Sequence, residues 1–373
     1  MKIAIVYDML YPFNVGGIEL RNYEVAKQLV KAGHEVHLYG VKLWEGKNVI
    51  KKDGIYYHGC CRYKELYNFS GKRRIIEPVK MAVCLFPSLL KDKYDIIECA
   101  SFPYFPFFSC YFVSKIKRTP LITVWHQYFD DFWFIYFGKL KGFFAYSIEM
   151  AVRKLSKIDI VVSKKTKRDL GGGIVIENGI DIEEIRKTKP SKEKSDLIYV
   201  GRLIKGKNVE LLLKSLPLIK KKYPDIKLLI VGDGPSRKDL ETLAVSLKIM
   251  KNVKFLGCQE KANIYSLIKS SKIFTFPSLV EGFGMVVTEA FGCGKPVIAI
   301  KSKWNASYTL IKNGKNGLVA EDNIESFTEK VINLLDNHML RKEMEVSAKM
   351  GAERYSWEKQ AGKLIGVYKN EIN

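Results

Sequence analysis

Acidic residues flank a strand, loop and helix transition in the second half of the chain. In the stretch Phe276–Phe291, FPSLVEGFGMVVTEAF, an apolar run ends at Pro277, a glycine-bearing loop carries Glu281, and a helical pattern carries Glu289. Helix side chains lean toward the helix N-terminus, so we expect both carboxylates to face one ligand. Paired acceptors suit the vicinal hydroxyls of a sugar, and the N–H groups of a helix end suit phosphate. A solvated loop acid and a capping acid are the alternative.

Two basic residues stand on another glycine-flanked loop. GRLIKGKN follows the strand-type run LIYVG and places Arg202 and Lys207 five residues apart. A forked guanidinium and a mobile ammonium can neutralise a nucleotide diphosphate, although two basic residues also occur on a loop by chance. GDGP, with Gly232 and Gly234, follows a later strand-type run and either approaches a ligand or forms a plain turn.

Glu281 and Glu289 form an E-x7-E pattern within EGFGMVVTEA, which is followed by GKPVIA. This resembles the donor-site signature of family 4 of the retaining glycosyltransferases, and further motifs occur in the expected order from Gly16 to Gly317. The resemblance implies transfer of a sugar from a nucleotide-diphosphate donor, with the nucleotide base and ribose near GDGP. It also implies that residues between the two acids contact the donor, namely Gly282, Phe283 and Gly284.

The first half of the chain opens with a similar alternation. KIAIVY, from Lys2 to Tyr7, is a strand-type run, and the helical pattern that follows ends at Gly33. The intervening loop reads NVGGIE and not G-x-G-x-x-G, so a dinucleotide site is poorly supported. Gly16 and Gly17 either let the backbone approach a ligand or form only a tight turn. In the family, this pair lies beside the donor phosphates or the acceptor.

Further strand-type runs continue the first half: Asp95–Cys99, Leu121–Trp125, Asp159–Val162 and Ile174–Ile176. His126 stands just past one of them, at the edge where open α/β sheets bind ligands. A lone histidine is often structural. This one resembles the family's histidine, whose side chain contacts the donor sugar or phosphate, and Ser163 corresponds to another position near the ligand.

Charged residues and a proline interrupt the alternation after ENGID, Glu177–Asp181. We place an exposed linker there, between a first domain of residues 1–182 and a second of residues 195–354. Strands and helices alternate in both, so the sequence predicts an α/β protein with two Rossmann-like domains. The resemblance adds the GT-B arrangement, with the acceptor-binding first domain and the donor-binding second domain facing across a cleft. It also implies a closing helix, residues 355–373, that returns to the first domain.

One segment departs from the family pattern. Members usually carry Gly-Gly and then Glu before an N-G-x-N-G-L-V segment, whereas this chain reads KSKWNASYTLIKNGKNGLV, with Thr309 in place of the Glu. The altered loop, Trp304–Thr309, leaves the identity of the donor sugar open. The altered loop supports one alternative, a binding protein that keeps the nucleotide site without transfer. A second alternative is a nucleotide-sugar 2-epimerase of the same fold, which the E-x7-E pattern with its GFG context disfavours.

Glycosyl transfer releases a diphosphate that needs positive charge, so Arg202 and Lys207 are candidate catalytic residues. Glu281, as an acceptor for sugar hydroxyls, and His126, by the resemblance, complete the candidate catalytic set. No Asp-x-Asp motif is evident, so we expect no metal and no cofactor, with the nucleotide-diphosphate sugar as donor substrate. The resemblance implies front-face attack, in which the donor's own phosphate takes the acceptor proton.

Composition limits the cellular setting. The N-terminal apolar run is too short for a signal peptide and no run is long enough to span a membrane, so we expect a cytoplasmic protein. The seven cysteines show no C-x-x-C spacing, which argues against a disulfide framework or a zinc site. A net charge of +22 calls for an anionic partner. Nucleic acid is disfavoured because no nucleic-acid-binding motif accompanies the charge.

Aromatic and basic residues cluster in the first half, in SFPYFPFFSCYFVSKIKR and YFDDFWFIYFGKLKGFFAY. Such segments are typical of the membrane interface, although a buried core or an acceptor pocket would use the same residues. We therefore hypothesise peripheral binding to the inner membrane face and a lipid or lipid-linked saccharide as acceptor. The basic residues concerned are Arg73, Arg74, Lys80, Lys115, Lys117, Arg118, Lys139 and Lys141.

Overall fold

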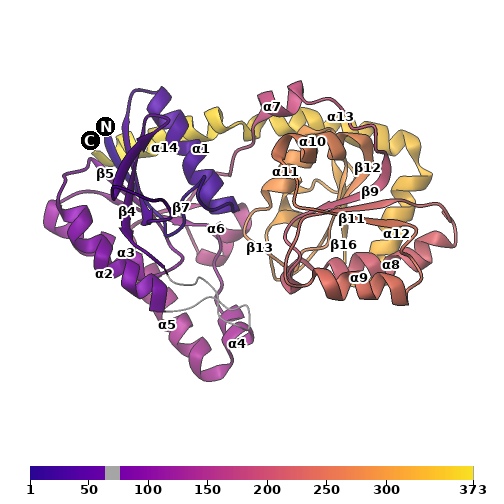
Figure 1. The fold of residues 1–373 in the computed structure, drawn as a ribbon, viewed down its shortest axis with the longest axis horizontal. Helices are drawn as coiled ribbons and strands as arrows, with labels where there is room; N and C mark the ends of the chain where they lie inside the picture. The colour runs from indigo at the N-terminus through magenta and orange to yellow at the C-terminus, as the bar shows by residue number, and fades with distance from the viewer. Residues whose placement is uncertain (64–75, 373) are drawn as a thin grey trace. The chain divides into compact units, whose positions relative to one another are not determined.

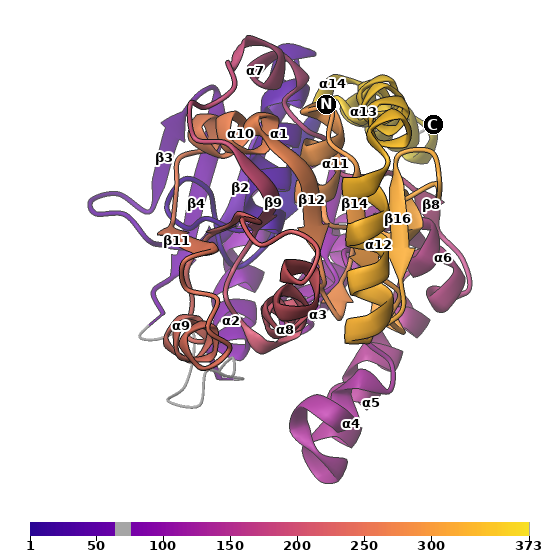
Figure 2. The same ribbon diagram turned by 90° about the vertical axis from the view of Figure 1, so that its right-hand side faces the viewer.

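The computed structural model describes residues 1–63 and 76–372, and the chain divides into two compact units (Figure 1). Unit 1 comprises Met1–Gly179 and Trp357–Asn373, and unit 2 comprises Ile180–Ser356. Each unit has a mainly parallel sheet with helices on both faces (Figures 1 and 2). The predicted α/β architecture of two Rossmann-like domains is confirmed.

Unit 1 is built on a sheet whose described strands run in the order β3-β4-β2-β1-β5-β6-β7-β8. They are β1 (Lys2–Val6), β2 (Glu35–Val41), β3 (Val49–Lys52), β4 (Ile55–Cys61), β5 (Ile96–Ala100), β6 (Leu121–Trp125), β7 (Ile158–Val161) and β8 (Ile174–Val175). Its helices are α1 (Gly17–Lys31), α2 (Ile76–Leu90), α3 (Phe105–Lys117), α4 (Phe132–Phe137), α5 (Lys139–Leu155), α6 (Lys164–Leu170) and α14 (Trp357–Ile372).

The strand order of unit 1 reverses between β1 and β5. Both strands are largely apolar, pair in parallel and are buried almost throughout. The antiparallel β3 and β4 hairpin at one edge was not predicted from the sequence. Ligands of open α/β sheets bind outside the carboxyl ends of the strands at such a reversal, where Asp8 and Ser101 follow the two strands.

The C-terminal helix α14 belongs to unit 1 and packs beside α1 (Figure 1). Its inward stripe, Ala361, Leu364 and Tyr368, is buried, as the spacing of an amphipathic helix requires. The Tyr368 hydroxyl donates a hydrogen bond to the Glu98 carboxylate on β5. This contact fastens the end of the chain to the sheet formed by its beginning.

Unit 2 is built on a sheet in the order β11-β10-β9-β12-β14-β16, with a separate pair of short strands, β13 and β15. The strands are β9 (Ser195–Val200), β10 (Leu228–Val231), β11 (Val253–Gly257), β12 (Ser271–Phe276), β13 (Val280–Glu281), β14 (Val297–Ile300), β15 (Trp304–Asn305) and β16 (Gly317–Ala320). The helices are α7 (Ile182–Lys187), η1 (Lys205–Lys207), α8 (Val209–Lys220), α9 (Arg237–Ser246), α10 (Lys261–Ser270), α11 (Met285–Gly292), η2 (Ser307–Leu310), α12 (Ile324–Asp336), α13 (His338–Ala352) and η3 (Glu353–Tyr355).

The order of unit 2 reverses between β9 and β12, so the loops after these two strands meet at one edge. They are the loops that carry Arg202 and Lys207 on one side and Glu281 on the other. The topology therefore brings together two motifs that the sequence placed more than seventy residues apart.

The boundary between the units differs from the expected linker. The chain passes from unit 1 to unit 2 at Gly179 and Ile180, and the stretch expected as an exposed linker contains α7. Ile182 and Ile185 are buried, and the Lys269 ammonium donates to the backbone carbonyl of Thr188 at 2.6 Å. These contacts hold a segment whose charge had suggested exposure.

No helix in the described ranges is long and apolar enough to cross a membrane. All seven cysteines lie in these ranges and are free thiols. Arg73 and Arg74, which the sequence analysis grouped with the membrane-facing residues, lie outside the described residues.

Candidate active site

Lys207 and Glu281 form an ion pair between the loop after β9 and the loop after β12. Their side chains are only 15% and 20% exposed. The Lys207 ammonium also lies 5.4 Å from the centre of the Phe276 ring, and Leu279 N–H donates to the Gly206 carbonyl at 2.9 Å. The structure thus brings two predicted site residues into direct contact in a partly desolvated position.

Arg202 lies on the same loop as Lys207 and is exposed. Its backbone carbonyl accepts a hydrogen bond from the Tyr199 hydroxyl at 3.2 Å. In the part of the chain that the structure describes, its guanidinium forms no ion pair. Arg202 therefore offers its full set of donors at the edge where Lys207 is already engaged.

The GDGP loop packs directly on the Arg202 loop. Leu203 N–H donates to the Asp233 carbonyl and Ser236 N–H to the Leu203 carbonyl, both at 2.9 Å. A Cβ on Gly232 would lie 2.0 Å from the Gly201 carbonyl oxygen, and one on Gly234 would lie 2.5 Å from that of Leu203. Both glycines thus have a structural reason to be glycine, and their contact with a nucleotide stays a prediction.

The loop before α11 is shaped by Gly284, which caps the helix with φ +89°. Beside it, Phe283 is buried and packs edge-on against Tyr355, with ring centres 6.1 Å apart. Phe283 therefore anchors the loop with its side chain and can meet a ligand only through its backbone. Gly282 is partly exposed, and the first N–H groups of α11 have no acceptor within the helix.

Glu289 lies on α11 with its own partners. The Tyr265 hydroxyl donates to its carboxylate at 2.9 Å. Burial raises the pKa of Glu289, and the Lys261 cation partly offsets the effect. Glu281 and Glu289 therefore do not share a partner in this structure, and their convergence on one ligand stays a prediction.

The loop that departs from the family pattern packs on Glu281. Strand β15 pairs with β13, and Ala306 N–H donates to the Glu281 carbonyl at 2.6 Å. Asn305 is fully buried and its amide donates to the carbonyls of Ser278 and Ile300 at 2.7 and 3.0 Å. Asn305 thus fixes the Glu281 loop, a role that the sequence analysis missed because its partners are distant in the chain.

Thr309 lies in η2 with its side chain exposed. Its hydroxyl donates to the Ala306 carbonyl at 2.6 Å. The residue that replaces the family's Glu is therefore engaged with its own turn, and it carries no charge toward the Glu281 loop.

His126 follows β6 in unit 1. Its Nε2 atom is buried and has no hydrogen-bond partner among the described residues. Burial, with the cation of Arg21, lowers the pKa of His126 well below its ordinary value. The imidazole is therefore neutral at neutral pH and carries an unsatisfied polar atom, which a ligand oxygen can satisfy.

A buried charge network accompanies His126 in unit 1. Arg21 on α1 forms an ion pair with Glu98 on β5, and the Tyr368 hydroxyl donates to the other Glu98 oxygen. The side chains of Arg21 and Glu98 are 4% and 1% exposed. Sequence reasoning missed this network, because nothing local links residues that lie 77 and 270 positions apart.

Gly16 and Ser163 have local roles. Gly16 is the N-cap of α1, where a Cβ would meet the Glu19 carboxylate at 2.5 Å, and Gly17 is the exposed first residue of the helix. Ser163 is buried and caps α6, because its hydroxyl accepts from Thr166 N–H at 3.0 Å. The cap role accounts for Ser163, whereas a Cβ on Gly16 would meet only the end of the flexible Glu19 side chain. Contact of Gly16, Gly17 and Ser163 with a ligand stays a prediction.

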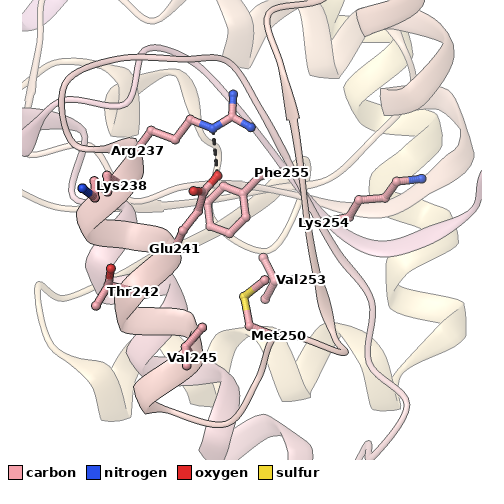
Figure 3. A pocket seen from close by; sticks show the side chains of 9 residues that line it. All are labelled: Arg237, Lys238, Glu241, Thr242, Val245, Met250, Val253, Lys254 and Phe255. Atoms are coloured by element: carbon pink, nitrogen blue, oxygen red, sulfur yellow. Dashed lines mark hydrogen bonds and ion pairs between the residues drawn. The ribbon is translucent and has the colours of Figure 1, made fainter.

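A shallow pocket lies between α9 and β11 in unit 2 (Figure 3). Arg237 pairs there with Glu241 at 2.8 Å and with Asp233 of the GDGP loop at 2.8 Å. None of the residues predicted to bind the donor lines it. Within the described ranges, no group of three or more His, Cys, Asp or Glu is placed to hold a metal ion.

Comparison with known families matches both halves of the chain. Residues 15–184 match the Glycosyltransferase Family 4 model, and residues 181–350 match the Glycosyl transferases group 1 model. An uncharacterized glycosyltransferase of Methanocaldococcus jannaschii is 28% identical, over 99% of this chain and 98% of its own length. A human relative, one subunit of the phosphatidylinositol N-acetylglucosaminyltransferase, is 25% identical, over 80% of this chain and 62% of its own length.

Solved structures show the same fold at low identity. Sucrose-phosphate synthase from Thermosynechococcus elongatus superposes with a TM-score of 0.81 at 17% identity, over 99% of this chain and 98% of that one. HepE of Anabaena, solved in complex with UDP and glucose, gives 0.75 at 20% identity, over 99% and 100%. The chain therefore carries two glycosyltransferase domains, one matching the Family 4 model and the next the group 1 model, and it has the GT-B fold of these structures.

Proposed function

We propose that this glycosyltransferase moves a sugar from a nucleotide-diphosphate donor to a lipid or lipid-linked saccharide, with retained anomeric configuration and without a resident metal. The observation that carries the donor proposal is the Lys207–Glu281 pair beside the exposed Arg202, at the edge where the strand order of unit 2 reverses. The cations can bind the diphosphate of such a donor, and the Glu281 carboxylate can accept hydrogen bonds from the hydroxyls of its sugar.

The residues of unit 2 would act mainly on the leaving group. Arg202 and Lys207 stabilise the negative charge that develops on the departing diphosphate, and the N–H groups at the start of α11 add to this. Glu281 orients Lys207 and accepts from sugar hydroxyls, while Glu289 holds the nucleotide portion. We name no protein base, since in the proposed front-face attack the donor's own phosphate takes the acceptor proton.

Unit 1 contributes a neutral histidine to the proposal. The buried Nε2 of His126 has no partner among the described residues, and in the neutral form it either donates to or accepts from an oxygen of the donor sugar or phosphate. A neutral ring contributes a hydrogen bond without adding charge. The buried Arg21–Glu98 ion pair joins α1 to β5, and we give it a structural role with no contact to the donor.

Relatives support the donor and acceptor classes. HepE binds UDP and glucose, and the human and yeast relatives are named for phosphatidylinositol N-acetylglucosaminyl transfer. The yeast protein is 22% identical over 99% of this chain and 83% of its own length. We accordingly place the enzyme on the cytoplasmic face of a membrane, bound peripherally where a lipid-borne acceptor is available.

A donor screen by thermal shift, followed by release of free nucleotide with and without lipid acceptors, tests the proposal. We expect stabilisation by one class of nucleotide sugar and acceptor-dependent release that EDTA does not abolish. Conversion of the donor without any acceptor would instead indicate a 2-epimerase. Donor binding with no turnover on any lipid, lipid-linked or soluble saccharide acceptor would indicate a binding protein.

A further inference from the structure

The helical hairpin formed by α4 and α5 projects beyond the sheet of unit 1 (Figures 1 and 2). Its outer end, residues 134–144, is here called the hairpin tip. Large apolar residues of the tip are exposed to solvent. Their exposed fractions are 37% for Phe134, 65% for Ile135, 74% for Leu140, 57% for Phe143 and 61% for Phe144. Contiguous exposed apolar side chains of this kind mark an interaction surface.

Contacts between α4 and α5 fix the conformation of the hairpin, so its exposed side chains belong to an ordered element. Gly138 turns the chain with φ +79°, and a Cβ on Gly142 would meet the Trp133 carbonyl oxygen at 2.7 Å, so the two helices touch at Gly142. Trp133 is buried, and its indole N–H donates to Glu149 at 3.2 Å. These contacts hold the inner face, while Ile135, Leu140, Phe143 and Phe144 on the outer face stay more than half exposed.

Exposure is not a general property of aromatic-rich segments in this chain. In the other aromatic stretch, around α3, Tyr104 and Phe107 belong to the buried core, and among its aromatics only Phe112 is exposed. The alternative of a buried core, left open by the sequence, therefore holds for most of that stretch and not for the hairpin tip. Of two aromatic-rich segments with similar composition, the hairpin tip is therefore the one that lies at the surface.

The charge on the hairpin suits an anionic surface. Between Asp131 and Glu149 the ionisable side chains with charge at neutral pH are Lys139 and Lys141, and both are exposed. A second copy of this chain docking by the same face would bring these lysines toward each other, which opposes a symmetric contact. Aromatic and aliphatic side chains flanked by lysines, with no acid between them, match the headgroup region of anionic lipid.

We infer that the hairpin tip is a membrane-docking element, which inserts Ile135, Leu140, Phe143 and Phe144 among anionic lipids while Lys139 and Lys141 lie against the headgroups. This inference rests on the proposed function only in that a lipid-borne acceptor gives the docking a purpose. Vesicle binding and glycosyl transfer are measured separately, so that the failure of one is distinguishable from the failure of the other.

The experiment is co-sedimentation of the full chain with phosphatidylcholine vesicles, with and without phosphatidylglycerol, at low and high salt. The wild type should pellet with the anionic vesicles at low salt and less at high salt. Lys139→Gln with Lys141→Gln should weaken this binding about 25-fold, since each basic residue near the surface contributes about fivefold. Leu140→Glu with Phe143→Glu should abolish pelleting in both salts.

Val346→Glu on α13 is the matched control, because Val346 is 61% exposed and lies in unit 2. It should bind vesicles as the wild type does. As a conservative probe, Phe144→Trp should show fluorescence quenching by brominated lipids that Val346→Trp does not show. Thermal melts establish that each variant is folded.

Two results would overturn the inference. One is a wild type that does not pellet with anionic vesicles at low salt, which would favour a protein partner for the tip. The other is hairpin variants that bind as well as Val346→Glu. Transfer to a short soluble acceptor should be the same in wild type and hairpin variants. A chain that binds vesicles but transfers no sugar to any acceptor would refute the proposed function and leave the membrane-docking inference intact.

Discussion

The two units place their charged groups differently relative to their sheets. In unit 2 the charges stand on loops, where Lys207 and Glu281 pair while partly exposed and Arg202 is open to solvent. In unit 1 they are buried against the sheet, where Arg21 on α1, Glu98 on β5 and Tyr368 on α14 satisfy one another beside a neutral His126. Charges on loops are available to a ligand at little cost to the fold, whereas buried charges are committed to the fold. The comparison predicts that substitution of the loop charges of unit 2 reduces activity, whereas substitution of the buried charges of unit 1 reduces stability.

The largest effect should come from breaking the buried pair of unit 1. Arg21→Met should reduce the free energy of unfolding of unit 1 by about 3–5 kcal/mol, because Glu98 is left charged and buried with only Tyr368 to compensate it. Hydrogen exchange at the amides of α1 and β5 reports on unit 1 alone. The control is Arg62→Met, since the exposed Arg62–Glu45 pair should contribute little to stability. Equal losses of unfolding free energy in both variants would contradict the distinction between buried charges that stabilise the fold and loop charges that are available to a ligand.

Removing the loop cations of unit 2 should reduce activity and spare the fold. Arg202→Ala and Lys207→Ala should each cost ~2–4 kcal/mol in kcat/KM, because phosphate charge is left unpaired in a partly desolvated site. Lys205→Ala, an exposed lysine of the same loop, serves as control and should stay within about threefold of wild type. If the two site variants also stayed within threefold, the diphosphate assignment would be wrong.

Glu149 gives the stability of unit 1 a dependence on pH. Its carboxylate accepts from the Tyr104 hydroxyl, the N–H groups of Phe129 and Asp130, and the Trp133 indole. Burial raises the pKa of Glu149 to about 7, against an ordinary value of 4.5, and these donors partly offset the rise.

The folded state therefore keeps a proton on Glu149 that the unfolded state releases. The contribution of Glu149 to stability is complete below about pH 4.5 and is lost as the pH rises to about 7, a change of up to about 3 kcal/mol. Urea unfolding of unit 1 across this range measures it. Glu149→Gln, which does not titrate, should flatten that part of the profile, and an unchanged slope would assign the pH dependence to other groups.

The smallest effect should separate the two carboxylates of unit 2. Glu289→Gln should weaken binding of a bare nucleoside diphosphate by roughly tenfold, about 1.4 kcal/mol. Glu281→Gln should leave that affinity unchanged or raise it, since Lys207 loses its partner, and should instead reduce turnover of the nucleotide sugar. Calorimetry with nucleoside diphosphate and steady-state kinetics measure the two effects. Equal losses of affinity would contradict the division of roles.

Sequence reasoning recovered the alternation of strands and helices because each element carries its own pattern. The β–loop–α units at Lys2, Ser195 and Ser271 are locally specified by apolar runs, glycine and helix spacing. It missed the antiparallel β3 and β4 and the helix α7 within the expected linker, and it left open whether the α4–α5 segment lies at the surface or in the core. In each case burial against distant parts of the chain, or the lack of it, decided the outcome.

For the candidate site, the sequence by itself determined which residue types stand on the loops that follow strands, and from these it predicted the candidate residues: Arg202 and Lys207, Gly232 and Gly234, Glu281 and Glu289, and His126. Residue type and spacing along one loop suffice for this. Only the tertiary structure decided that Lys207 meets Glu281, that Asn305 fixes the Glu281 loop, and that Arg21, Glu98 and Tyr368 form one network. These contacts join residues far apart in the chain, and which of them meet depends on the strand order and on the helix that returns to unit 1, because no local pattern encodes the partner of a buried charge.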